Sequence, residues 1–220
     1  MVGKRKVREL ITGQGILPLY FHPDPEVSKE VLRAVYRSGI RTIEYTNRGE
    51  SALENFKLLV ASRDRELEGM VLGAGTIKTQ DEANRYMEAG ADFLVSPGLN
   101  TEICRFALDT GFFYAPGCMT PSEIVAAENM GLDFIKLFPG NLLGPAFVSS
   151  IKDIFPKLSF MPTGGVDTSA ENLREWFSAG VAAVGMGSKL ISKKLMEERD
   201  YATIADSASK VLRLIAGIKR

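Results

Sequence analysis

Residues 93–137 read FLVSPGLNTEICRFALDTGFFYAPGCMTPSEIVAAENMGLDFIKL. Three short apolar runs occur here, Phe93–Ser96, Phe113–Ala115 and Phe134–Leu137. They alternate with two segments, 102–110 and 121–130, whose apolar residues recur at helical spacing. Short apolar runs bounded by turn residues are typical of buried strands. Their alternation with helical segments predicts parallel strands joined by helical crossovers.

The same alternation extends in both directions from this stretch. Eight apolar runs are expected to form strands: Ile16–Tyr20, Thr42–Tyr45, Met70–Ala74, Phe93–Ser96, Phe113–Ala115, Phe134–Leu137, Ser159–Pro162 and Ala182–Gly185. Eight strand–helix units of roughly 25 residues predict an α/β fold that closes into a (β/α)8 TIM barrel. An open, doubly wound sheet is the structural alternative. Residues 1–15 are expected to form an extra, amphipathic N-terminal helix, and no linker divides residues 1–220, which predicts a single domain.

Charge and composition exclude several classes of function. The 220 residues contain 27 Lys+Arg and 27 Asp+Glu, so the formal net charge is zero. We therefore expect no binding to nucleic acid and no attraction to an anionic membrane. The N-terminus lacks the apolar core of a signal peptide, and no apolar run is long enough to span a bilayer, which predicts a cytoplasmic protein. One histidine, and two cysteines without metal-type spacing, predict that no metal is bound.

The predicted barrel places candidate catalytic residues at the ends of the strands, where active sites of this fold lie. Lys136 and Glu44 lie within the sixth and second strands, and strand alternation turns both side chains toward the interior. Desolvation lowers the pKa of a buried lysine, and the neutral amine can attack a ketone to form a Schiff base. An inward glutamate can shuttle protons for such a reaction. The alternative is a structural ion pair between the two groups.

Two further residues are suited to binding a carboxylate. Arg48 follows the second strand, and a guanidinium can bind the carboxylate of an α-keto acid through two parallel hydrogen bonds. Thr76 ends the run Gly73-Ala74-Gly75-Thr76, where glycines allow close approach of a ligand and the hydroxyl can donate a hydrogen bond. Alternatively, Arg48 is a solvated surface residue and Thr76 is a helix cap.

Two glycine-rich turns predict a phosphate site. The seventh strand ends in Pro162-Thr163-Gly164-Gly165, and the eighth ends in Gly185-Met186-Gly187-Ser188. Each turn offers backbone N–H groups near a helix start, and the loops after strands seven and eight are the usual phosphate site of this fold. Tight turns without a ligand are the alternative.

Together these motifs resemble the 2-keto-3-deoxy-6-phosphogluconate / 4-hydroxy-2-oxoglutarate aldolase family over almost the entire chain. The matching segments, in order, are Ile43-Glu44 with Arg48, Gly73-Ala74-Gly75-Thr76, Ser96-Pro97-Gly98, Pro116-Gly117, Lys136-Leu137-Phe138-Pro139, Met161-Pro162-Thr163-Gly164-Gly165 and Gly187-Ser188. The resemblance implies a class I lyase that needs no metal or other cofactor and releases pyruvate. It also implies a homotrimer.

The resemblance further implies a role for each matching residue. Lys136 would be the Schiff-base lysine and Glu44 the proton-transfer group. The remaining roles are pyruvate binding by Arg48, Thr76 and Pro97, and phosphate binding by Thr163, Gly164, Gly165, Gly187 and Ser188. The implied substrate is a phosphorylated keto-deoxy sugar acid, 2-keto-3-deoxy-6-phosphogluconate, which would yield pyruvate and glyceraldehyde 3-phosphate, with 4-hydroxy-2-oxoglutarate as a further substrate.

Some positions depart from the gluconate-cleaving members of the family. Pro139-Gly140-Asn141 replaces their usual Pro-Ala-Glu, and Gly144-Pro145 is closer to the relatives that cleave 2-keto-3-deoxy-6-phosphogalactonate. The galactonate compound is therefore the alternative substrate. A phosphosugar isomerase or epimerase, or a sugar-phosphate sensor, could use the same barrel without a reactive lysine. An inward lysine, without a pair of acidic residues for two-base proton transfer, argues against the isomerase. The Glu44–Lys136 pair argues against the sensor, which needs no reactive amine.

Overall fold

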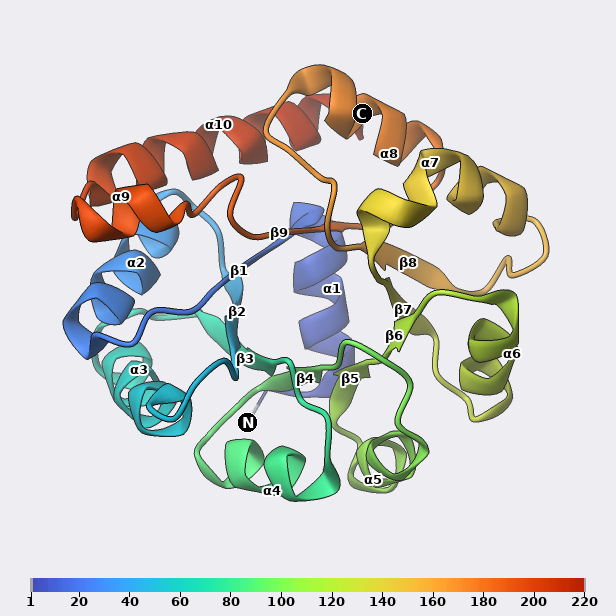
Figure 1. Cartoon of the computed structure of the whole chain (residues 1–220), viewed down its shortest axis with the longest axis horizontal. Helices are drawn as coiled ribbons and strands as arrows, with labels where there is room; N and C mark the ends of the chain where they lie inside the picture. Colours follow the sequence, from blue (N-terminus) through green and yellow to red (C-terminus); the bar gives the residue numbers. More distant parts are fainter. Residues whose placement is uncertain (1, 220) are drawn as a thin grey trace.

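Strands and helices alternate along the chain in a computed structural model that describes residues 2–219 (Figure 1). The strands are β1 (Ile16–Tyr20), β2 (Thr42–Thr46), β3 (Val71–Gly75), β4 (Phe93–Val95), β5 (Phe113–Ala115), β6 (Gly117–Cys118), β7 (Phe134–Leu137), β8 (Ser159–Pro162) and β9 (Val184–Met186). The helices are α1 (Lys4–Gln14), α2 (Pro25–Arg37), α3 (Ala52–Glu66), α4 (Gln80–Glu88), α5 (Thr101–Thr110), α6 (Pro121–Asn129), α7 (Gly140–Ile151), α8 (Ala170–Ser178), α9 (Lys193–Glu197) and α10 (Tyr201–Ile218). Among these residues, no helix is long and apolar enough to cross a membrane.

The strands pair in parallel, which confirms the predicted α/β class. They form a six-stranded sheet in the order β5-β4-β3-β2-β1-β9 and a three-stranded sheet in the order β6-β7-β8. A parallel bridge between Thr163 and Gly185 links the end of β8 to β9. Figure 1 shows the strands at the centre and helices α2 to α10 arranged around them.

The predicted fifth strand, Phe113–Ala115, coincides with β5, but a further short strand that was not predicted, β6, follows on the other side of Pro116. β5 pairs with β4, whereas β6 pairs with β7. Proline has no N–H to donate to a ladder, so the strand is interrupted there. The Pro116 carbonyl still accepts a hydrogen bond from Lys136 N at 2.9 Å, which keeps β7 alongside the break.

Side chains alternate between two apolar layers, as predicted from the strand pattern. Phe134 and Met161 belong to an inner cluster, whereas Ile135 and Leu137 belong to the cluster between strands and helices. This alternation places Lys136 on the same face of β7 as Phe134. Lys136 therefore faces the interior of the strand layer.

The helix α1 corresponds to the predicted N-terminal helix and covers one end of the strands. Its residues Val7 and Ile11 are completely buried in the inner cluster with Leu17 and Phe113. Figure 1 shows α1 behind the strands at the centre of the view. The loops that leave the carboxyl ends of the strands lie at the opposite end.

Glycines end several of the helices, as the sequence predicts. Gly39, Gly90, Gly111, Gly131 and Gly180 all have positive φ angles, between 67° and 96°. Other residues rarely adopt this left-handed conformation, so these glycines fix where the helices end and the next strand begins.

Candidate active site

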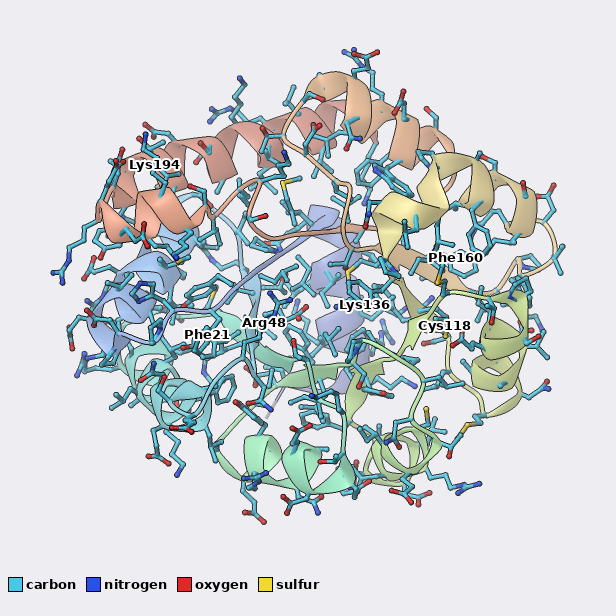
Figure 2. All side chains as sticks on the ribbon, viewed as in Figure 1. Phe21, Arg48, Cys118, Lys136, Phe160 and Lys194 are labelled. Atoms are coloured by element: carbon cyan, nitrogen blue, oxygen red, sulfur yellow. The ribbon has the colours of Figure 1, made fainter. Side chains whose placement is uncertain are left out.

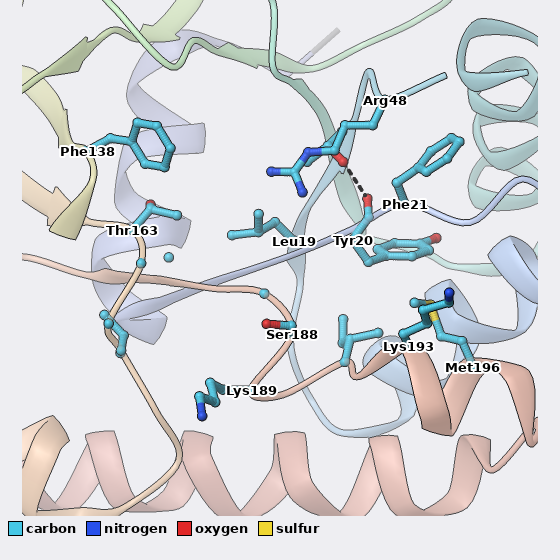
Figure 3. Close-up of a pocket in the computed structure, with 17 residues that line it drawn as sticks. Leu19, Tyr20, Phe21, Arg48, Phe138, Thr163, Ser188, Lys189, Lys193 and Met196 are labelled. Atoms are coloured by element: carbon cyan, nitrogen blue, oxygen red, sulfur yellow. Dashed lines mark hydrogen bonds between the residues drawn. The ribbon is translucent and has the colours of Figure 1, made fainter. Parts of the chain in front are cut away.

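A pocket of about 400 Å³ lies where β1, β2, β8 and β9 end (Figure 3). It is lined by Leu19, Tyr20, Phe21, Thr46, Arg48, Phe138, Thr163, Gly164, Gly165, Val166, Gly185, Gly187, Ser188, Lys189, Ile191, Lys193 and Met196. Because all the strands are parallel, their carboxyl ends meet at this single face. The predicted location of the site at the strand ends agrees with this pocket.

Six of the predicted site residues line the pocket: Arg48, Thr163, Gly164, Gly165, Gly187 and Ser188. Figure 3 shows the guanidinium of Arg48 extending into the pocket toward Thr163 and Leu19. Arg48 is also exposed to solvent, so its position fits both the predicted carboxylate-binding role and the surface alternative. The side-chain oxygen of Thr163 is buried and has no hydrogen-bond partner among the described residues. A buried hydroxyl without a hydrogen-bond partner costs free energy. The Thr163 hydroxyl is therefore suited to bind a ligand that supplies the missing hydrogen bond.

The loop after β8 is held in place by close contacts with the start of α7. Gly164 and Gly165 have φ angles of 94° and 72°. A Cβ on Gly140 would lie 2.4 Å from the Gly164 carbonyl oxygen, and Gly140 N donates to the Thr163 carbonyl at 2.8 Å. The glycine at position 140 therefore permits an approach of the two loops that a Cβ at this position would obstruct.

Lys136, Glu44, Thr76 and Pro97 do not line this pocket. Lys136 is only 5% exposed, and its Nζ lies 5.2 Å from the ring centroid of Phe138, which is a wall of the pocket. Figure 2 places Lys136 and Arg48 in the central region that the strands surround. Lys136 thus lies next to the pocket, on the interior side of its wall.

Glu44 is 1% exposed, and neither carboxylate oxygen has a hydrogen-bond partner within residues 2–219. The predicted structural ion pair would need such a bond to Lys136, so that alternative does not describe this structure. A Cβ on Gly75 would lie 1.7 Å from Glu44 Oε1. Gly75 therefore provides the space that the Glu44 carboxylate occupies.

Thr76 and Pro97 lie at the ends of the neighbouring strands. Thr76 has a φ angle of 60°, an uncommon conformation for a residue with a side chain. A Cβ on Gly117 would lie 2.3 Å from the Pro97 carbonyl oxygen, and Gly117 is the register partner of Lys136. The backbone of Pro97 is therefore packed against the strand next to the lysine.

Sequence reasoning missed several residues of the pocket. Phe21 and Met196 form part of its apolar wall, and Lys189 and Lys193 add positive charge. Lys189 directly follows the glycine–serine turn, so its position alone could have identified it. The other three follow no motif.

Two residues with chemically versatile side chains have structural roles in the fold. The His22 side chain accepts a hydrogen bond from Asp24 N at 3.1 Å, at the start of α2. Cys118 is buried, and burial raises the pKa of its thiol to about 12. Within the described part of the chain, no group of His, Cys, Asp and Glu could hold a metal ion.

These observations define an α/β protein of parallel strands with a partly cationic pocket at the strand ends and a buried lysine beside it. The family model of KDPG and KHG aldolase matches residues 7–207. The 2-dehydro-3-deoxy-phosphogluconate aldolase of Haemophilus influenzae is 30% identical over 181 residues, covering 81% of this chain and 82% of the relative. The 2-dehydro-3-deoxy-6-phosphogalactonate aldolase of Escherichia coli is 32% identical over 121 residues, covering 54% and 58%.

A solved structure is also similar along most of its length. The KDPG aldolase of Legionella pneumophila, with pyruvate captured as a covalent carbinolamine intermediate, gives a TM-score of 0.85 at 25% identity. The match covers 93% of this chain and 97% of that one. The chain therefore belongs to the KDPG and KHG aldolase family.

Proposed function

We propose that this protein is a class I aldolase that cleaves 2-keto-3-deoxy-6-phosphogluconate to pyruvate and glyceraldehyde 3-phosphate, without a metal or other cofactor. The observation that carries the proposal is the placement of Lys136, which is buried on the inner face of β7 beside the pocket. The Legionella relative, which holds pyruvate as a carbinolamine, supports covalent chemistry of this kind. We further propose that the two sheets act as one closed (β/α)8 barrel, supported by the bridge from Thr163 to Gly185.

In the proposed cycle the Lys136 amine attacks the C2 ketone of the substrate, and loss of water gives an iminium. Glu44, acting through a water, removes the proton of the C4 hydroxyl. The C3–C4 bond breaks, its electron pair moves toward the iminium, and the aldehyde leaves. The resulting enamine takes a proton at C3, and water then hydrolyses the imine to release pyruvate and restore Lys136.

The binding groups divide between the two ends of the substrate. Arg48 and Thr76 are proposed to bind the pyruvate carboxylate, and Pro97 to shape that end of the site. Thr163, Gly164, Gly165, Gly187 and Ser188 are proposed to bind the distal phosphate through backbone N–H and hydroxyl groups. The second group lies together in the pocket, which supports its assignment to one end of a ligand.

A second candidate substrate is the galactonate epimer, favoured by the similarity to the Escherichia coli phosphogalactonate aldolase. The two compounds differ in configuration at C4. Separate assays with each pure epimer, coupled to pyruvate detection, measure the ratio of kcat/KM values. A higher kcat/KM for the galactonate compound would reverse our choice of substrate. The same assay is also run with 4-hydroxy-2-oxoglutarate, the further substrate that the resemblance implies.

The covalent step is tested by borohydride reduction in the presence of pyruvate, followed by peptide mapping. We expect one adduct on Lys136 and none in Lys136→Ala. Lys152→Ala is a matched control, because Lys152 is also partly buried beside an aromatic ring, with Nζ 5.5 Å from the Phe160 centroid. Trapping on another lysine, or turnover retained by Lys136→Ala, would contradict the assignment.

We also propose a homotrimer in the cytoplasm. Two apolar side chains are exposed, Val125 of α6 at 42% and Leu142 near the start of α7 at 67%, which supports burial against another copy. Both cysteines are free, which suits a reducing compartment. Light scattering during gel filtration measures the oligomer directly, and a monomer at micromolar concentration would contradict the trimer.

A further inference from the structure

The pocket has a charge balance unlike that of the whole chain. Arg48, Lys189 and Lys193 line it, and no Asp or Glu is among its lining residues in the described part of the chain. The chain as a whole carries 27 basic and 27 acidic residues. A random sample of this surface would include both signs, so the pocket is a local concentration of positive charge.

The two lysines lie at the phosphate end of the pocket. Lys189 directly follows Ser188, and Lys193 begins α9 one turn further along the chain. Figure 3 shows them on either side of Ser188, with Arg48 across the pocket. One arginine and two lysines therefore line the same pocket from different segments, and the two lysine side chains in Figure 3 are directed outward from Ser188.

Neither lysine is held by a strong internal partner. The only ion pair of Lys193 within residues 2–219 is with Glu197, at 3.5 Å, between side chains that are 85% and 57% exposed. Exposed pairs of this kind contribute little. The pKa of Asp167 is lowered mainly by a hydrogen bond from Ser169 and to a smaller extent by the charge of Lys189, which places Lys189 near the loop after β8. Both ammonium groups can therefore turn toward a ligand.

We propose that Lys189 and Lys193 complete the distal anion subsite and make the enzyme select a doubly charged phosphate over a neutral or singly charged end group. The inference rests on the proposed aldolase function, but it assigns residues outside the glycine–serine turns. A phosphate monoester carries a charge of about −1.5 to −2 at pH 7 and has three acceptor oxygens. Two ammonium groups therefore gain more from it than from a carboxylate or a hydroxyl.

The test uses Lys189→Met and Lys193→Met, which keep the length of the side chain and remove the charge. The reaction is the condensation of pyruvate with glyceraldehyde 3-phosphate, compared with unphosphorylated glyceraldehyde. We expect each variant to raise KM for the phosphorylated aldehyde by about three- to tenfold. We expect kcat, and both constants for glyceraldehyde, to change by less than about twofold, because the lysines do not contact the reacting carbons.

Lys194→Met is the matched control. Lys194 is the next residue of α9, its side chain is 79% exposed, and it does not line the pocket. Added salt should reduce the effect at positions 189 and 193, because exposed charges are screened. The proposal would be overturned if KM rose equally for both aldehydes, or if Lys194→Met raised KM for the phosphorylated aldehyde as much as the other two variants do.

Two further readouts separate this inference from the proposed function. Pyruvate trapping on Lys136 does not involve the distal end, so failure of trapping in the unmodified protein rejects the aldolase mechanism itself. Calorimetry with inorganic phosphate measures the subsite without turnover. We expect the double variant to bind phosphate at least about tenfold more weakly. Intact trapping with unchanged phosphate binding would reject only the role of the lysines.

Discussion

Replacing Gly75 by alanine adds one methyl group at the most crowded point of the candidate site. That Cβ would lie 1.7 Å from Oε1, 2.4 Å from Cδ and 2.6 Å from Cγ of Glu44. No carbon can approach another heavy atom so closely, so the Glu44 side chain must leave its position or the strands must separate. Overpacking a core costs about 1–3 kcal/mol.

The effect on catalysis should exceed the effect on stability. A positioned general acid–base contributes about 10²–10⁴-fold, or about 3–5 kcal/mol of transition-state stabilisation. We expect Gly75→Ala to lose most of this factor in kcat because its methyl group displaces the Glu44 carboxylate. Urea unfolding should show a loss of about 1–3 kcal/mol. Gly13→Ala is the control, since a Cβ there meets nothing within 4 Å.

A double-mutant cycle tests the reasoning. If the methyl group acts by displacing Glu44, adding Gly75→Ala to Glu44→Ala should reduce kcat by less than about threefold further. Cleavage is followed by coupling pyruvate to lactate dehydrogenase. Fully multiplicative losses in the double variant, or near-normal kcat in Gly75→Ala, would refute the claim that Gly75 exists to accommodate this carboxylate.

Three further variants or measurements follow from other contacts. Gly140→Ala places a Cβ 2.4 Å from the Gly164 carbonyl oxygen, so KM for the phosphorylated substrate should rise about tenfold while pyruvate trapping persists; unchanged KM would contradict the packing argument. Hydrogen bonds from Arg33 lower the pKa of Glu66 to about 2, so this pairing stabilises the fold above the ordinary carboxyl pKa and is lost as the pH falls toward 2. Glu66→Gln should therefore lower Tm at pH 7 but not near pH 2, which calorimetry measures. Burial raises the Cys118 pKa to about 12, so iodoacetamide at pH 8 should label this thiol only after unfolding, as peptide mapping would reveal.

Apolar runs located the strands well because burial on both faces leaves little freedom in composition. The strands β1, β5, β7 and β8 have the predicted limits, and the boundaries of the other predicted strands differ by at most two residues. The strand β6 was not predicted, since its two residues are too few to form a recognisable apolar run. α9 was missed because five residues are too few for a helical period to appear.

The site was only partly predictable for a different reason. Alternation within a strand determines the face on which Lys136 lies, and glycine-rich turns can be recognised directly in the sequence. The wall formed by Phe21 and Met196 joins residues far apart in the chain, so no local pattern marks it. The contact between Gly75 and Glu44 likewise depends on the register of two strands, which only the three-dimensional structure gives.

The helix α1 closes the end of the strand layer that lies opposite the pocket. Val7 and Ile11 seal the end of the inner cluster, and Phe134 and Met161 fill the space below Lys136. In the proposed reaction, water, substrate and both products must therefore share a single entrance at the strand ends. Pyruvate, tethered to the lysine, stays behind the aldehyde on the way out. The architecture therefore predicts an ordered release of products, in which the aldehyde leaves first and pyruvate leaves last.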